Sequence, residues 1–156
     1  MKKLSLILNI VFIAIIAVGA YKFIIAGSTE VADDGRTAIL LEAGERDFVL
    51  GEMRLFLETV QGVVAAVAEN DMAKVAALST AVGMGSTGGE TAALIGKLPL
   101  DFKTLGLATH ALFDDLAAEA TDLGDATVVT ASLGVLMENC TSCHAGYRFD
   151  VAGTGK

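Results

Sequence analysis

Residues 129–148, with the sequence VTASLGVLMENCTSCHAGYR, combine a helical pattern with both cysteines of the chain. Apolar positions recur three or four residues apart, which predicts an amphipathic helix. The positions that share this face are Val129, Leu133, Leu136, Cys140, Cys143 and Tyr147. Because the two thiols are so close in sequence, a disulfide between them would close too short a loop to stabilise a fold. The pair therefore points to chemistry rather than to a structural bridge.

Three earlier segments show the same helical spacing. A helix is expected from about residue 45 to 70, and Asp71 is a natural N-cap for the next one. Pro99 suits the first turn of a third helix, and Asp125 precedes the last. The stripe of the first of these helices is Val49, Met53, Phe56, Val60, Val63 and Val67. Four amphipathic helices with short connections predict an all-α domain, an antiparallel four-helix bundle, over 42–156.

The N-terminal residues 1–27 form a separate unit. Two lysines are followed by 23 residues, 4–26, that are apolar apart from a few positions, and about 20 suffice to cross a bilayer. We expect a retained transmembrane helix, with Lys22 reaching the interface. A cleaved export signal ending near Ala20 is the alternative. Glycines and aspartates over 28–41 predict an irregular tether.

Charge is distributed unevenly between these units. Residues 1–27 hold three of the 11 basic residues and none of the 19 acidic ones, so the remainder has eight basic against 19 acidic residues. An acidic domain excludes nucleic acid as a partner, because the phosphates would repel it. The N-terminal lysines predict a cytoplasmic N-terminus and a domain on the outer face. We expect a single-pass protein of the bacterial inner membrane, with its globular domain in the periplasm.

A Cys-x-x-Cys pair has three common meanings: a dithiol redox pair, half of a zinc site, or two thioether anchors for haem. A zinc site needs about four ligands, and His110 and His144 do not complete a familiar zinc spacing. In Cys140-Thr-Ser-Cys143-His144, however, a histidine follows the second cysteine directly. The thiols can add to the porphyrin vinyl groups while the imidazole binds iron. The pentapeptide therefore predicts one covalently attached haem c.

A C-terminal haem motif on the last helix of a four-helix bundle resembles the cytochrome c-prime family, the class II c-type cytochromes. The resemblance covers roughly residues 42–150. It implies that haem lies within the bundle, that His144 is the proximal iron ligand, and that the first helix faces the distal side. Family members often dimerise through their first two helices, which makes a homodimer one expectation.

The distal position decides between the two branches of that family. One branch places an apolar residue there and has five-coordinate iron; the other places methionine there and is low-spin. The matching position is Met53, so the resemblance is to the methionine-ligated branch, although Met53 as a core residue and His110 as a rival ligand remain open. Arg148, four residues after the motif histidine, is expected to bind a haem propionate, with Arg46 a weaker candidate. Val49 stands where the family tends to have arginine.

These expectations describe an electron carrier rather than an enzyme, because no nucleophile–base pair, acid pair or phosphate loop is apparent. We expect a membrane-tethered monohaem cytochrome that passes single electrons to a membrane electron-transfer complex or another redox protein. A five-coordinate protein that binds nitric oxide or carbon monoxide is the alternative. A third hypothesis is an accessory subunit with a structural haem.

Overall fold

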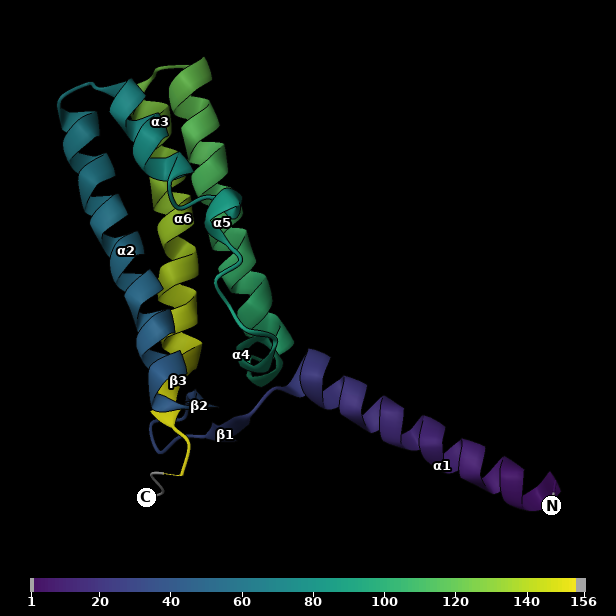
Figure 1. Ribbon diagram of the computed structural model, residues 1–156. Helices are drawn as coiled ribbons and strands as arrows, with labels where there is room; N and C mark the ends of the chain where they lie inside the picture. Colours follow the sequence, from purple (N-terminus) through teal and green to yellow (C-terminus); the bar gives the residue numbers. More distant parts are fainter. Residues whose placement is uncertain (1, 154–156) are drawn as a thin grey trace.

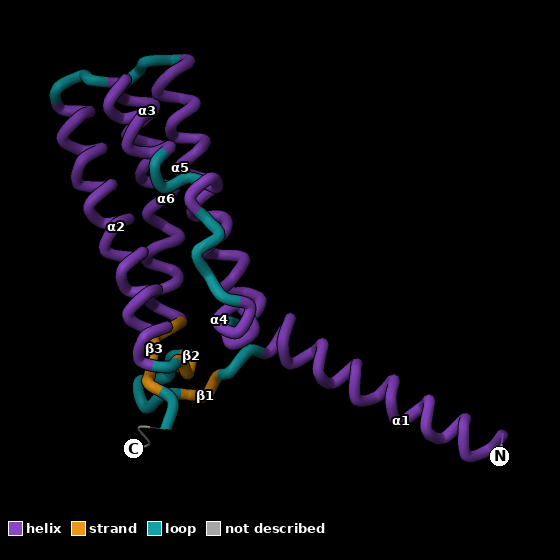
Figure 2. Tube along the Cα trace, viewed as in Figure 1, coloured by secondary structure: helices purple, strands orange, loops and turns teal. Residues whose placement is uncertain are grey.

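A computed structural model describes residues 2–153, so the last residues of the expected domain, 154–156, lie outside the described part. The chain is mostly helical and has one small sheet (Figures 1 and 2). Its elements are α1 (Lys2–Tyr21), η1 (Lys22–Ala26), β1 (Thr29–Val31), β2 (Thr37–Leu41), α2 (Ala43–Ala68), α3 (Met72–Thr80), η2 (Met84–Ser86), α4 (Ala92–Lys97), α5 (Leu100–Asp122), α6 (Ala126–Gly146) and β3 (Tyr147–Val151).

The helix termini follow from local capping. Glu42 and Glu45 form a capping box at the start of α2. The Asp71 carboxylate accepts a hydrogen bond from the Lys74 amide at 2.9 Å and begins α3, as predicted. The Asp125 carboxylate likewise accepts amide hydrogen bonds at the start of α6. The predicted helices near 45–70, after Asp71, after Pro99 and after Asp125 are confirmed.

The larger hydrophobic core lies between α2, α3, α5 and α6. The side chain of Phe113 is fully buried there and stacks on Phe56, with ring centroids 5.4 Å apart. The other buried members are Val63, Ala66, Val75, Val82, Leu116, Ala120, Val129, Leu133 and Leu136. Each buried aliphatic or aromatic side chain contributes about 1.5–3 kcal/mol through the hydrophobic effect. This core holds α2, α3, α5 and α6 together.

A three-stranded sheet corrects the expectation of an all-α domain. β1 pairs with β2 in antiparallel fashion, and β2 pairs with β3 in parallel, with Ile39 opposite Phe149. Residues 28–41 are therefore not an irregular tether: Ala38, Ile39 and Leu41 of β2 are fully buried. Tyr147, which was expected on the last helix, begins β3. A buried strand of five residues has no alternating pattern, so its periodicity does not reveal it.

Short elements between α3 and α5 were also not predicted. After the glycine-rich segment, Thr91 caps the six-residue helix α4 by accepting a hydrogen bond from the Leu94 amide at 3.2 Å. Leu94 and Leu98 are buried in a second, smaller core with Ile39, Leu41, Val49 and Phe102. This smaller core joins the sheet, the start of α2 and α4 at one end of the helices.

Within the described residues, one helix, Lys3–Ala26, is long and apolar enough to span a membrane, with a mean hydropathy of 2.5. None of its most apolar window is buried against the rest of the structure. Figure 1 shows α1 extending away from the packed helices, with α4 and the small sheet at the end of the helices nearest to it. The expected single apolar N-terminal helix is therefore present.

Candidate functional site

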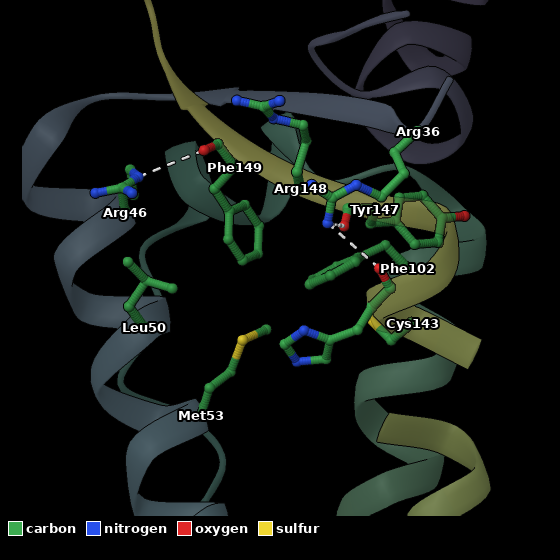
Figure 3. A pocket seen from close by; sticks show the side chains of 10 residues that line it. Arg36, Arg46, Leu50, Met53, Phe102, Cys143, Tyr147, Arg148 and Phe149 are labelled. Atoms are coloured by element: carbon green, nitrogen blue, oxygen red, sulfur yellow. Dashed lines mark hydrogen bonds between the residues drawn. The ribbon is translucent and has the colours of Figure 1, made fainter. Parts of the chain in front are cut away.

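A pocket of about 320 Å³ opens at the end of the helices that carries the sheet (Figure 3). This volume is at the lower end of the roughly 300–1,000 Å³ typical of cofactor sites. Residues from α2, α5, the end of α6, the β1–β2 turn and β3 line it. They are Arg36, Arg46, Leu50, Met53, Phe102, Cys143, His144, Tyr147, Arg148 and Phe149.

The last turns of α6 supply the sulfur and imidazole groups. Cys143 and His144 line the pocket, whereas Cys140, one turn earlier on the same helical face, packs against the larger core. Cys143 instead packs against the smaller core, so the two thiols lie where the two cores meet. Both thiols are free and only partly buried. Burial raises the pKa of each thiol, which keeps both protonated at neutral pH.

Met53 lies on the opposite wall. Its side chain extends from α2 into the pocket toward the end of α6 that carries Cys143 (Figure 3). The residue is only partly buried and packs against the smaller core. Leu50, one turn earlier, lines the same wall. The predicted thioether and the predicted proximal imidazole, His144, therefore line one pocket from two different helices.

Aromatic rings close the side of the pocket between α5 and β3. Phe102 meets Tyr147 and Phe149 edge to face, with both centroid separations at 5.5 Å. Such pairs contribute about 0.5–1.5 kcal/mol beyond the area that they bury. A flat apolar ligand entering the pocket would contact Leu50 on one side and these rings on another.

Arg148 lines the pocket from β3 and not from the last turn of a helix, because α6 ends at Gly146. The expectation that it follows His144 by one helical turn is therefore wrong. Its guanidinium donates to Asp150 at 2.8 Å and pairs with Asp34 at 3.3 Å. Two carboxylates of the chain itself thus pair with the positive charge of Arg148.

Two further arginines lie at the pocket. Arg36 Nη1 donates to the main-chain oxygens of His144 and Tyr147, both at 3.3 Å, and Arg36 Nη2 pairs with Asp34 at 2.7 Å. Hydrogen bonds from the Arg36 side chain and from its amide to the Asp34 carboxylate lower the pKa of Asp34 from 3.8 to about 2. Arg46 Nε donates to the Phe149 carbonyl at 3.4 Å, a bond drawn in Figure 3. Three arginines therefore line the pocket, whereas the sequence pointed to Arg148 and, more weakly, to Arg46.

Sequence reasoning missed Arg36 altogether. It reaches the pocket because β2 pairs with β3, two segments about 110 positions apart whose contact leaves no trace in local spacing. Arg46 had a visible signal, since it lies seven positions before Met53 and so two helical turns along the same face.

His110 does not reach this pocket. It is buried within α5, where Nδ1 lies 2.8 Å from the Val82 carbonyl and the ring meets Phe56 edge to face at 4.9 Å. It is a packing residue of the larger core. Met53, Cys143, His144 and Tyr147 are the pocket side chains of types that bind haem iron, and Met53 and His144 are the two that the sequence predicted as ligands.

Among residues 2–153, no group of three or more histidine, cysteine, aspartate and glutamate side chains is placed to hold a metal ion. A zinc centre of about four protein ligands is therefore not supported within the described part of the chain. A porphyrin supplies four nitrogen ligands of its own, so haem needs only one or two ligands from the protein. The residues at the pocket fit that smaller requirement.

Three comparisons with known proteins gave no match: no family model, no curated protein and no solved structure matches the chain. The resemblance to class II c-type cytochromes consequently rests on the haem motif, on helix order and on the residues that meet at this pocket.

Proposed function

We propose that this chain is a membrane-tethered monohaem c-type cytochrome that transfers single electrons. One observation carries the proposal: the Cys-x-x-Cys-His histidine of α6 and the methionine of α2 line the same pocket. The motif predicts a haem anchor with its proximal ligand, and it was identified without reference to Met53. The meeting of the two at one pocket is what a six-coordinate haem requires.

The chemistry of the pocket residues fits haem c. Cys140 and Cys143 would form thioethers with the vinyl groups, His144 would bind iron on one side, and Met53 on the other. A thioether is a soft ligand that stabilises ferrous iron and raises the reduction potential. Bound in this way, haem supplies a one-electron carrier. The protein positions it, tunes its potential and limits the access of water.

The charged groups fit the two propionates of haem. We assign them to Arg46 and Arg148, whose guanidinium groups match carboxylates in geometry. Arg36 has a different role: it holds the main-chain oxygen of His144 and so orients the proximal ligand. In this assignment Arg46 replaces the basic group that Val49 does not provide.

The helices that surround the larger core support the class II architecture. We propose that α2, α3, α5 and α6 are the antiparallel four-helix bundle of that family, extended here by the three-stranded sheet and α4. The N-terminal helix would tether the domain to the outer face of a bacterial inner membrane. A membrane electron-transfer complex or another redox protein would then be its partner.

Covalent attachment tests the proposal. The full chain is expressed in a bacterium with an active cytochrome c maturation system, and haem is detected on a denaturing gel. We expect haem to stay with the native chain and to be lost from the double variant Cys140→Ser, Cys143→Ser. His110→Ala is the matched control and should keep its haem. A native chain without covalent haem would overturn the proposal.

A further inference from the structure

The end of the apolar N-terminal helix is fastened to the globular domain. The ring of Phe23 in η1 packs so closely on Gly96 of α4 that a methyl group at residue 96 would overlap it. Gly27 has φ +64° and lies directly against the main chain of α4, where any side chain would collide. The Ser28 amide donates to the Lys97 carbonyl at 2.7 Å. These contacts join the apolar helix to α4 without a flexible linker.

Lys103 completes this junction from α5. Its ammonium group donates to the main-chain oxygens of Ile24 at 2.9 Å, Phe23 at 3.2 Å and Ile95 at 3.4 Å. The last carbonyls of a helix have no partners within the helix and carry partial negative charge, so a cation there is favourable. Lys103 therefore ties the end of the apolar helix to both α4 and α5.

Apolar side chains remain exposed on the domain side of the junction. Ile95 of α4 is 38% exposed and Leu100 at the start of α5 is 40% exposed. Leu100 shares a helical face with Lys103, three residues later, and that lysine contacts η1. The exposed Leu100 is thus on the face of α5 that carries the junction with the apolar helix.

Lysines lie close to these exposed aliphatic side chains. Residues 91–100 contain one lysine and no acidic residue, although the chain as a whole has 19. Lys103 donates to the Ile95 carbonyl, and Lys22 directly precedes Phe23 of the junction. Exposed aliphatic groups beside lysine ammonium groups suit the headgroup region of a bilayer. The first turn of α5 also has one exposed acidic residue, Asp101, and Lys97 of α4 pairs with Glu45 at 2.7 Å.

We propose that α4 and the first turn of α5 form a lipid-contacting surface, with Ile95 and Leu100 in the interfacial region of the outer leaflet. The proposal rests on the membrane-tether part of the proposed function. Lipid is the occupant because the surface is continuous with the end of the membrane-spanning helix. A second copy or a soluble protein would have to compete with headgroups already at that position.

This surface would hold the haem pocket close to the membrane. Leu94 of α4 and Leu98, directly after α4, are buried in the same core as Phe102, which also lines the pocket. One side of α4 thus faces lipid, and its other side packs in the smaller core next to the pocket. The electron-transfer partner that such an arrangement favours is a membrane protein whose own redox group lies near the outer surface of the bilayer.

The chain contains no tryptophan, so a single introduced tryptophan reports its own surroundings. We would prepare Leu100→Trp and Ile95→Trp in the full-length, haem-loaded protein and reconstitute each in vesicles of phosphatidylcholine with phosphatidylglycerol. The control is Leu123→Trp, at the far end of α5, where the native side chain is 63% exposed. Emission is compared in vesicles with and without bromine near the carbonyl end of the acyl chains. The ratio of emission with and without bromine is taken within each variant. Quenching by haem is the same in both vesicles and therefore cancels.

We expect bromolipid to quench the tryptophans at positions 95 and 100 and to leave that at 123 unchanged. Equal quenching at all three positions, or none at 95 and 100, would overturn the lipid contact. Flotation of the same vesicles tests the anchor: protein that fails to float overturns both the tether and the contact. Haem absorbance is read on the same samples. Quenching at 95 and 100 without haem would support the contact and overturn only the electron-carrier function.

Discussion

The two ends of the helical body are stabilised in different ways. The core around Phe113 is made by helices and the turn after α3, and most of its members are fully buried. The pocket end combines short strands, three arginines and a smaller core, on which Met53, Cys143, Tyr147 and Phe149 are only partly buried. The first end is complete without a ligand. The second presents apolar groups that a bound haem would cover. In the proposed function, the first end therefore stabilises the fold and the second performs the chemistry.

The largest expected difference between the two ends is in stability. Phe113→Ala should lower the free energy of unfolding by about 3–5 kcal/mol, because it leaves a cavity in a closely packed core. Phe149→Ala removes a ring that is already partly exposed, so it should cost less in the protein without haem. Urea unfolding followed by circular dichroism measures both. Equal losses for the two variants would show that the ends do not differ in this way.

Arg36→Gln should produce a smaller effect, confined to the pocket end. It removes the bonds from the guanidinium to the main-chain oxygens of His144 and Tyr147, each worth about 0.5–1.5 kcal/mol. Because the Arg36 side chain is about one-third exposed, we expect a loss near the lower figure. In the haem-loaded protein that we propose, the absorption bands should also shift, because His144, the proposed proximal ligand, loses support.

Arg54→Gln is the matched control for this experiment, because Arg54 is an exposed residue of α2 that does not line the pocket. It should change neither the unfolding free energy nor the spectrum. If Arg36→Gln left the haem spectrum unchanged, Arg36 would have no part in positioning His144.

The smallest expected effect is a pH dependence at the same end. The folded pKa of Asp34 is about 2, below its ordinary 3.8, because Arg36 donates to it. A depressed carboxylate pKa adds stability that is complete above the unfolded value and is lost as pH falls through the folded one. The stability difference between the native chain and Asp34→Asn should therefore be constant above pH 3.8 and shrink toward pH 2. High salt should reduce this difference. A difference that does not change with pH would contradict this account.

The sequence predicts the helical end well because its signals are local. The stripe from Val49 to Val67 gives the axis and the buried face of α2, and side-chain caps such as Asp71 and Asp125 mark where helices begin. These signals need no knowledge of distant residues. The capped helices accordingly begin where the local pattern places them.

The pocket end could be predicted only in part. The Cys-x-x-Cys-His motif and the inward stripe of α2 are local, so Cys143, His144 and Met53 could be placed on their helices. The pairing of β2 with β3 is not local, and it moves Arg148 onto a strand and brings Arg36 to the pocket. Which charged side chains meet through such a pairing can be known only from the three-dimensional structure.

The most direct test of the central claim, His144 and Met53 as the two protein ligands of a haem, is an absorption spectrum. The purified protein is recorded oxidised, reduced with dithionite, and then exposed to carbon monoxide. We predict sharp low-spin bands on reduction that carbon monoxide does not change, conversion to high spin in Met53→Leu, and no conversion in His110→Ala. A broad high-spin spectrum that shifts with carbon monoxide in the native protein would contradict ligation by Met53 and favour a gas-binding function.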